Sequence, residues 1–363
     1  MTAAGRIMRS EYMHWAKTQA QARYNLAGSG VAHYPLAELP VKVEDLEING
    51  PSQYGYAPLQ KALAAHCGVS PDCVMAATGA SMANHLAIAV SVKPGEAVLI
   101  EQPAYELLVS AARYLGADVR RFPRRFEDGF RIDPAKIERA ITEHTRLIVL
   151  TNLHNPSSAF TEEATLRRIG EIARGVGARV LVGEVYLDAA FELAPRSAFH
   201  LGPEFISSNS LTKVYGLSGL RCGWILAAPD IIERIWRLND LFGVIPAHAA
   251  ERLSVISLAH LDRIRSRSRS LVEANREALN RFLELRDDLE SARLDFGTVA
   301  FPRLKRGSVE QLCKLLREKY ETTVVPGRYF EMPQHFRVGI GGDSAALAEG
   351  LARIGAALDE FHS

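Results

Sequence analysis

A serine, a lysine and an arginine at fixed spacing form the pattern in this sequence that best predicts chemistry. Ser210 precedes Lys213 by three residues and Arg221 follows it by eight, within the stretch SNSLTKVYGLSGLRCGW. Apolar, strand-like segments flank this stretch, so we expect the lysine in a turn where its amine loses hydration. A desolvated amine can form a Schiff base with a carbonyl, and a guanidinium beside a hydroxyl suits a phosphate. Together they indicate pyridoxal phosphate, and the alternative is an ordinary solvated lysine.

Seven short apolar segments alternate with helical patterns along the first two thirds of the chain. They are residues 73–78, 97–101, 117–122, 146–151, 179–184, 205–208 and 223–228. This alternation predicts an α/β protein whose seven-stranded, mostly parallel sheet is sandwiched by helices. Ligands of such sheets bind beyond the carboxyl ends of the strands. Because Ser81, Tyr105, Asn155, Tyr186 and Lys213 all follow such ends, we expect them to surround one site.

The pattern changes after residue 229, where helices dominate and strands become sparse. We predict a large cofactor-binding domain at residues 38–245 and a smaller α+β domain made of residues 1–37 and 246–363. A long helical pattern covers residues 247–285 and includes the arginine–serine run DRIRSRSRS. Such runs can bind RNA, but this one lies within a helical pattern of a neutral chain. We therefore interpret it as a solvated helix face.

Composition excludes several classes of function. The 363 residues carry 43 Lys and Arg against 42 Asp and Glu, a net charge of +1. This balance shows no excess of basic residues that would indicate nucleic-acid binding. The four cysteines form no CxxC pair and no zinc-ligand spacing, so we expect reduced thiols and no metal. No run of 18 apolar residues predicts a membrane span, and the first residues lack the apolar core of a signal peptide. These features predict a cytoplasmic protein.

The whole chain resembles the class I/II aminotransferases, a fold-type-I pyridoxal-phosphate family. The most specific part of the resemblance is the Ser-x-x-Lys motif with an arginine eight residues further on. It implies that Lys213 is the catalytic residue that holds the cofactor, and that Ser210 and Arg221 bind its phosphate. It also implies an enzyme that moves an amino group between an amino acid and a 2-oxo acid. The resemblance further implies a homodimer with its site at the interface.

Other residues match the family in the family's order. Ala80 and Ser81 match a phosphate-binding loop, where free N–H groups at the start of a helix attract an anion. Tyr105 matches the aromatic residue that stacks on the pyridine ring. Asn155 and Tyr186 match the two residues that donate hydrogen bonds to the ring 3-oxygen. Locally, a capped turn explains Ser81 equally well, and packing alone explains Tyr105.

Two further residues are candidates for binding the substrate. Arg337, in HFRVGIG, matches the arginine that holds the substrate carboxylate through a two-pronged contact. Gly30 lies in the glycine-rich corner AGSG, where the backbone can approach a ligand closely. The alternatives are a surface arginine on a strand and a plain turn.

Gly183 is the main departure from the family pattern. The family usually has an aspartate there, whose charge keeps the pyridine nitrogen protonated and makes the ring an electron sink. Without it the pKa of that nitrogen falls. The neighbouring Glu184 replaces the aspartate only if a bulge turns it inward, because adjacent strand residues face opposite ways. This departure leaves lyase or racemase chemistry, or a weakly active cofactor-binding protein, as alternatives.

A second departure concerns the tyrosine that the partner subunit of such enzymes often lends to the phosphate. No tyrosine stands at the expected place, where Asn49 and Gly50 are found. Tyr54 takes that role only if its loop is shifted in register.

Overall fold

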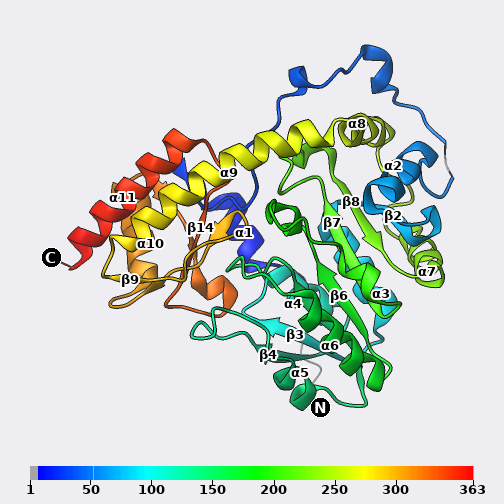
Figure 1. Cartoon of the computed structure of the whole chain (residues 1–363), viewed down its shortest axis with the longest axis horizontal. Helices are drawn as coiled ribbons and strands as arrows, with labels where there is room; N and C mark the ends of the chain where they lie inside the picture. The colour runs from blue at the N-terminus through cyan, green and yellow to red at the C-terminus, as the bar shows by residue number, and fades with distance from the viewer. Residues whose placement is uncertain (1–6, 52, 363) are drawn as a thin grey trace.

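The central sheet has seven strands, which confirms the predicted fold class. The computed structural model describes residues 7–51 and 53–362. In spatial order the strands are β2 (Val74–Thr78), β8 (Cys222–Leu226), β7 (Phe205–Ser210), β6 (Arg179–Gly183), β5 (Thr145–Thr151), β3 (Ala97–Gln102) and β4 (Asp118–Pro123). Strand β8 runs antiparallel to both of its neighbours, and the other pairs are parallel. All seven predicted strand segments therefore lie in one sheet (Figure 1).

Helices cover both faces of this sheet because its strands are apolar on both sides. One face packs against α3 (Gly79–Ser91), α4 (Glu106–Tyr114) and α7 (Pro229–Asn239) through a buried cluster that includes Leu86, Leu108 and Ile235. The other face packs against α5 (Pro134–Ala140) and α6 (Glu163–Gly175). The carboxyl ends of the parallel strands are thereby held at one edge of a rigid layer.

The long helical pattern after residue 246 is two helices, not one. The predicted helix at 247–285 breaks at His260 into α8 (His248–Ala259) and α9 (Leu261–Glu284). Helix α8 packs against α2 (Ala57–Cys67) beside the large sheet, whereas α9 leads into the smaller part of the molecule (Figure 1).

The smaller part combines helices with very short strands. Helix α9 packs there against α11 (Ser344–His362), which also contacts α10 (Val309–Lys319). The strands pair as β10 (Val299–Ala300), β14 (Phe336–Gly339) and β13 (Val325–Pro326), as β1 (Tyr24–Asn25) with β12 (Thr322–Thr323), and as β9 (Leu289–Glu290) with β11 (Arg303–Leu304). The sequence pattern of residues 1–22 predicts a helix, and the structure has the shorter helix α1 (Glu11–Thr18) there; residues 1–6 lie outside the described part.

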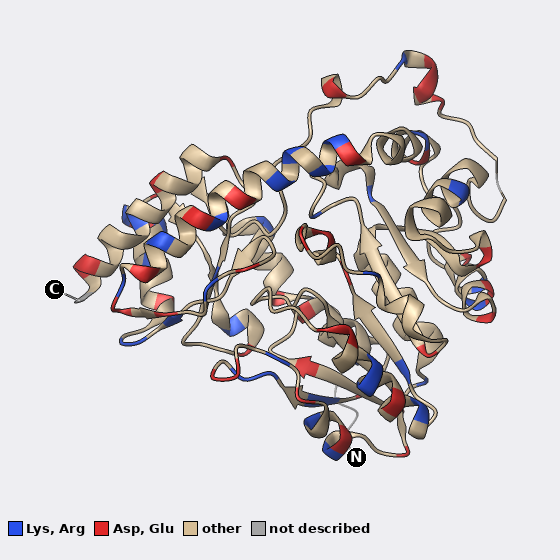
Figure 2. Ribbon diagram, in the orientation of Figure 1, with Lys and Arg blue, Asp and Glu red and all other residues tan. Residues whose placement is uncertain are grey.

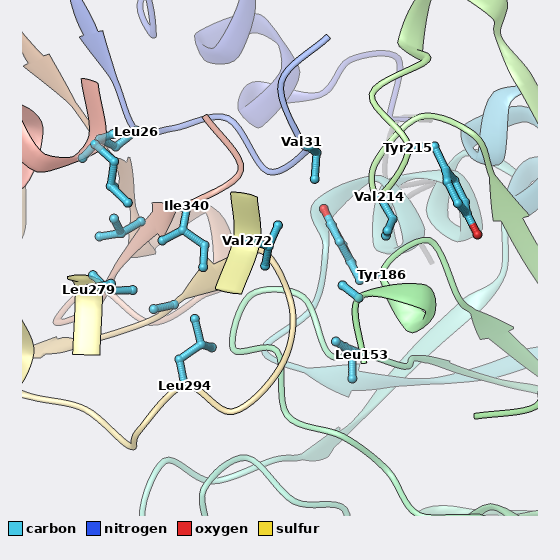
Figure 3. Close-up of a cluster of buried hydrophobic side chains, with 14 of the residues drawn as sticks. Leu26, Val31, Leu153, Tyr186, Val214, Tyr215, Val272, Leu279, Leu294 and Ile340 are labelled. Carbon is cyan, nitrogen blue, oxygen red and sulfur yellow. The ribbon is translucent and has the colours of Figure 1, made fainter. Parts of the chain in front are cut away.

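A continuous apolar cluster joins the two parts of the molecule. Val272 of α9 and Ile340 after β14 belong to the same buried cluster as Val31 and Tyr186 (Figure 3). Burying one such side chain stabilises the folded state by roughly 1.5–3 kcal/mol. The shared core fixes the segment around residues 25–31 against the loop that follows β7.

The arginine–serine run lies on the mixed-charge surface of α9 (Figure 2). Arg263 donates to the hydroxyl of Tyr34 at 3.0 Å, and Arg267 donates to the carbonyl oxygen of Ala32 at 3.4 Å. Arg269 pairs with Glu273 on the exposed face. The run is therefore a helix face, as predicted, and two of its arginines also anchor the segment at residues 32–38. Within the described residues no helix is both long and apolar enough to cross a membrane.

Candidate active site

A cavity of about 360 Å³ lies where the carboxyl ends of the strands meet the segment around residues 25–29. Eight of the predicted site residues line it: Ala80, Ser81, Tyr105, Asn155, Tyr186, Ser210, Lys213 and Arg221. They lie at the ends of five different strands or in the loops and helix starts that follow them. The structure therefore brings together residues that are up to 141 positions apart in the chain, as the strand-end argument predicted.

Lys213 lies in the loop after β7 with its amine inside the cavity. Its Nζ donates a hydrogen bond of 3.0 Å to the Ser29 hydroxyl. Burial lowers the pKa of Lys213, and the nearby charges of Arg337 and Arg221 lower it further, against an opposing effect from Tyr12. A lysine with a lowered pKa has a larger fraction of neutral, nucleophilic amine. This environment contradicts the alternative of a solvated surface lysine.

Another part of the cavity wall is shaped to receive an anion. Arg221 lies so close to Gly79 that a Cβ atom on this glycine would come within 2.2 Å of the Arg221 guanidinium. Gly79 also has a positive φ of 74°, which favours glycine, and its N–H donates to the carbonyl oxygen of Arg221 at 2.6 Å. The first turn of α3 presents Ala80 and Ser81 to the same space. A glycine cradle, a helix N-terminus and a guanidinium together fit a phosphate group.

Asn155 is oriented by the arginine predicted to bind substrate. Arg337 is buried, and it donates to Asn155 Oδ1 at 3.0 Å, to the Tyr12 hydroxyl at 2.9 Å and to the carbonyl oxygen of Ala27 at 3.0 Å. The bond to Asn155 Oδ1 leaves the amide nitrogen as the donor available to the cavity. Burial raises the pKa of Tyr186, so this hydroxyl keeps its proton and can also donate. Two donors therefore stand near Lys213, as a ring 3-oxygen requires.

Arg337 and Gly30 lie behind the cavity wall instead of lining it. Gly30 packs on Lys213, since a Cβ atom there would lie 3.4 Å from the Lys213 carbonyl oxygen, and the wall beside it is formed by Gly28 and Ser29. The Arg337 Nε atom is buried and has no hydrogen-bond partner among the described residues. The substrate roles of both residues stay predictions.

A buried polar chain supports Asn155 from below, and the sequence did not reveal it. The backbone N–H of Asn155 donates to Thr151 Oγ1 at 3.0 Å, and that hydroxyl donates to Glu101 Oε1 at 2.6 Å. Glu101 in turn pairs with Arg124 at 2.8 Å, and both side chains are fully buried. A carboxylate bonded in this way locks the loop after β5, because leaving any of its partners unpaired is costly.

Three further residues around the cavity were not predicted. Ser29 holds the Lys213 amine, Tyr12 of α1 holds Arg337, and Asn84 of α3 lines the cavity. Ser29 lies in the AGSG corner that we singled out for its glycines alone. Asn84 is one helical turn after Ser81, a spacing that places both on the same face of α3. Its polar side chain in a largely apolar helix pattern was the available signal.

Glu184 does not replace the aspartate missing at Gly183. Gly183 lines the cavity, but Glu184 faces the other side of the sheet, as strand alternation requires. There its Oε1 accepts hydrogen bonds from the backbone N–H of Ala198 at 2.7 Å and from the Ser207 hydroxyl at 3.2 Å. No aspartate or glutamate lines the cavity among the residues that the structure describes.

The buried Glu184 predicts a measurable dependence of stability on pH. Burial raises its pKa from 4.5 to about 7. The folded state therefore binds the proton more tightly, so this stabilisation is complete below about pH 4.5 and is lost as the pH rises through 7. We expect Glu184→Gln, whose amide oxygen can accept the same two hydrogen bonds, to match the wild type at low pH. Above the folded pKa it should be more stable by on the order of 3 kcal/mol.

Denaturant unfolding of both proteins on either side of neutrality measures this difference. A stability difference that does not change with pH would contradict the raised pKa.

Tyr54 lies on the surface, away from the cavity of its own chain. Its ring packs 5.8 Å from that of Trp236, and its hydroxyl donates to Asp240 at 2.8 Å. The side chain is 55% exposed, so it is available to a second molecule.

The fold and the cavity define a class of protein: an α/β protein with a half-buried lysine and an anion cradle beyond the strand ends. The model for the aminotransferases of class I and II matches residues 47–354, and the chain belongs to this family. The family uses pyridoxal phosphate, which confirms the predicted cofactor at that level. The anion cradle and the donors near Lys213 fit this group.

Individual relatives span different reactions. A capreomycidine synthase from Streptomyces vinaceus is 30% identical over 352 residues, which cover 92% of this chain and 89% of that protein. A solved PLP-dependent aminotransferase from Streptococcus suis has a TM-score of 0.92 at 26% identity, covering 98% of this chain and 99% of that one. The PLP-dependent cyclase OrfR has a TM-score of 0.84 at 24% identity and covers 93% of each chain, which shows a shared fold.

Proposed function

We propose that this protein is a pyridoxal-phosphate-dependent aminotransferase that moves an amino group between an amino acid and a 2-oxo acid. The observation that carries the proposal is the half-buried Lys213 amine in a cavity that an anion cradle and two hydrogen-bond donors also line. The family membership and the relative from Streptococcus suis support the same reaction class.

The proposed roles follow from where each group lies. Ser210, Arg221 and the N–H groups of Ala80 and Ser81 bind the phosphate. Tyr105, which lines the cavity beside Tyr12, stacks on the ring of the cofactor.

Asn155 and Tyr186 would donate hydrogen bonds to the ring 3-oxygen. When bound, pyridoxal phosphate supplies an electron-withdrawing ring that stabilises negative charge at the substrate α-carbon. Nζ of Lys213 would hold the cofactor, and as a free amine it would take the proton from the substrate α-carbon and later return a proton. The Ser29 hydroxyl accepts a hydrogen bond from this amine and thereby orients it.

A second candidate keeps the cofactor and changes the reaction. Gly183 supplies no charge to the ring, which weakens it as an electron sink. The capreomycidine synthase relative and the cyclase of the same fold support cyclisation, elimination or racemisation as the alternative.

Single-turnover reactions with one amino acid at a time separate the two candidates. For an aminotransferase, protein loaded with pyridoxal phosphate should release one 2-oxo acid per bound cofactor and no ammonia. Further turnover should then require an added 2-oxo acid. Release of ammonia, loss of stereochemical configuration, or a cyclised product without any 2-oxo acid would contradict transamination and favour the second candidate.

We also propose that two copies of the chain associate through the surface around Tyr54. Exposed apolar residues occur on the segment at 36–48 and on the turn after α7: Leu36, Val43, Leu46, Ile48, Leu241, Phe242, Val244 and Ile245. The first of these segments arches away from the body of the molecule (Figure 1). Exposed apolar surface of this kind marks association sites. Sedimentation of the full-length protein as a monomer at micromolar concentration would contradict the proposal.

A further inference from the structure

Because Gly183 has no side chain, a space remains at this position, and the side chain of another residue lies next to it. Gly183 on β6 pairs with Ser208 on β7, so the side chains at these two positions lie on the same face of the sheet. A Cβ atom on Gly183 would point toward that face and lie 4.0 Å from Ser208 Oγ and 3.2 Å from Thr151 Cγ2. The Ser208 hydroxyl is bonded at 2.6 Å to Asn84 Oδ1. A carboxylate at position 183 would therefore lie beside the Asn84 carboxamide.

The Asn84 carboxamide presents a donor to the cavity. The Ser208 hydroxyl donates to its oxygen, which leaves the amide nitrogen with two N–H groups. Within residues 7–51 and 53–362 this nitrogen has no hydrogen-bond partner, and Asn84 lines the cavity. Asn84 reaches the site from α3, whose first turn also forms the anion cradle, so one helix would touch both the phosphate and the ring.

The other polar groups near Gly183 are already engaged. Thr151 Oγ1 donates to Glu101 and accepts from the backbone of Asn155. Glu101 lies behind Thr151 and is paired with Arg124. Glu184 faces the opposite side of the sheet. Within the described residues, Asn84 therefore keeps an unused N–H donor on the side of the cavity that Gly183 borders.

We propose that the Asn84 carboxamide, oriented by Ser208, is the partner of the pyridine nitrogen and keeps that nitrogen unprotonated. This inference rests on the proposed binding of pyridoxal phosphate. An N–H donor pairs with the lone pair of a neutral pyridine nitrogen, whereas a protonated nitrogen needs an acceptor such as a carboxylate. A hydrogen bond to the neutral form lowers the pKa of the nitrogen. Asn84 thus acts in the direction opposite to the aspartate that Gly183 replaces.

The protonation state is measured directly by the ¹⁵N NMR shift of bound pyridoxal phosphate labelled at the ring nitrogen. Wild-type protein should show the unprotonated shift throughout the neutral pH range. Asn84→Asp and Gly183→Asp each place a carboxylate beside the nitrogen and should both move the shift to the protonated value. A protonated nitrogen in the wild type would overturn the inference.

Binding affinity supplies a second readout that does not depend on turnover. Asn84→Leu keeps the size of the side chain and removes its donor, so affinity for pyridoxal phosphate should fall about tenfold. Affinity for a carbon analogue, with C–H in place of the ring nitrogen, should not fall. Ser208→Ala serves as the orientation control, because it keeps Asn84 and removes the bond that aims it.

The outcomes separate this inference from the proposed function. If Asn84→Leu binds both compounds as the wild type does, the partner assignment is wrong although the cofactor site stands. If wild-type protein binds neither compound, the proposed function fails and the inference fails with it.

Discussion

Replacing Lys213 by alanine should reduce turnover by about 10⁴-fold or more, because one side chain supplies both covalent attachment and proton transfer. The variant should also lose the visible absorbance that depends on a carbon–nitrogen double bond between protein and cofactor. Binding of pyridoxal phosphate itself should persist, since the anion cradle of Gly79 and Arg221 is untouched. Absorbance spectra, reduction with borohydride and steady-state rates measure the three effects.

Two controls distinguish a chemical role for Lys213 from a structural one. Ser29→Ala removes the 3.0 Å hydrogen bond to the amine but keeps the amine, so it should retain the visible absorbance and lose only about tenfold in rate. Lys314→Ala, on the exposed side of α10, should behave as the wild type. If Lys213→Ala keeps its visible absorbance and can still be reduced by borohydride, another residue holds the cofactor.

The sequence predicted the sheet because its strands carry their own signal. Continuous apolar runs such as residues 146–151, separated by helical periods, identify buried strands whatever their neighbours are. The spatial order and the antiparallel direction of β8 could not be predicted in this way, since an apolar run has no direction. The break at His260 was missed for a similar reason. Both helices around it have a helical period, and the packing of α8 on α2 decides where the chain bends.

Residues that act alone were easier to predict than residues that act through a partner. Lys213 and Arg221 carry charges in an apolar setting and could be singled out from spacing. Asn84 is bonded to Ser208, which is 124 positions away in the chain, and Ser29 is bonded to Lys213, which is 184 positions away. No local pattern contains such a pairing. The sequence shows that position 183 has no acidic side chain. It does not show which side chain lies next to Gly183 in the folded protein.

Arg337 lies in an environment that the sequence did not predict. The prediction was an arginine with its guanidinium open to a substrate carboxylate. The structure instead has its two terminal nitrogens bonded to Asn155, Tyr12 and Ala27. A carboxylate must therefore compete with the Tyr12 hydroxyl, which belongs to α1. The N–H of Tyr12 donates to Glu106 Oε2 at 2.8 Å, so this helix is itself tied to the start of α4.

We expect Arg337→Leu to lower kcat/KM for amino acids by about 10²–10³-fold, the usual effect of removing one member of a buried charged contact. The loss should lie mainly in KM, because the carboxylate is bound before and during the reaction. Tyr12→Phe is the matched control. It removes the competing hydroxyl and leaves the guanidinium in place, so it should not weaken binding of the carboxylate.

A substrate without a carboxylate separates binding from structural damage. Arg337 is buried and holds Asn155 Oδ1, so its loss also affects the architecture of the site. The primary amine that corresponds to the decarboxylated amino acid cannot use a carboxylate contact in either protein. If Arg337 binds the carboxylate, this amine should react at similar rates with the wild type and with Arg337→Leu, while the amino acid reacts far more slowly with the variant. An equal loss for both compounds would assign Arg337 to support of Asn155, and the carboxylate would then need another partner.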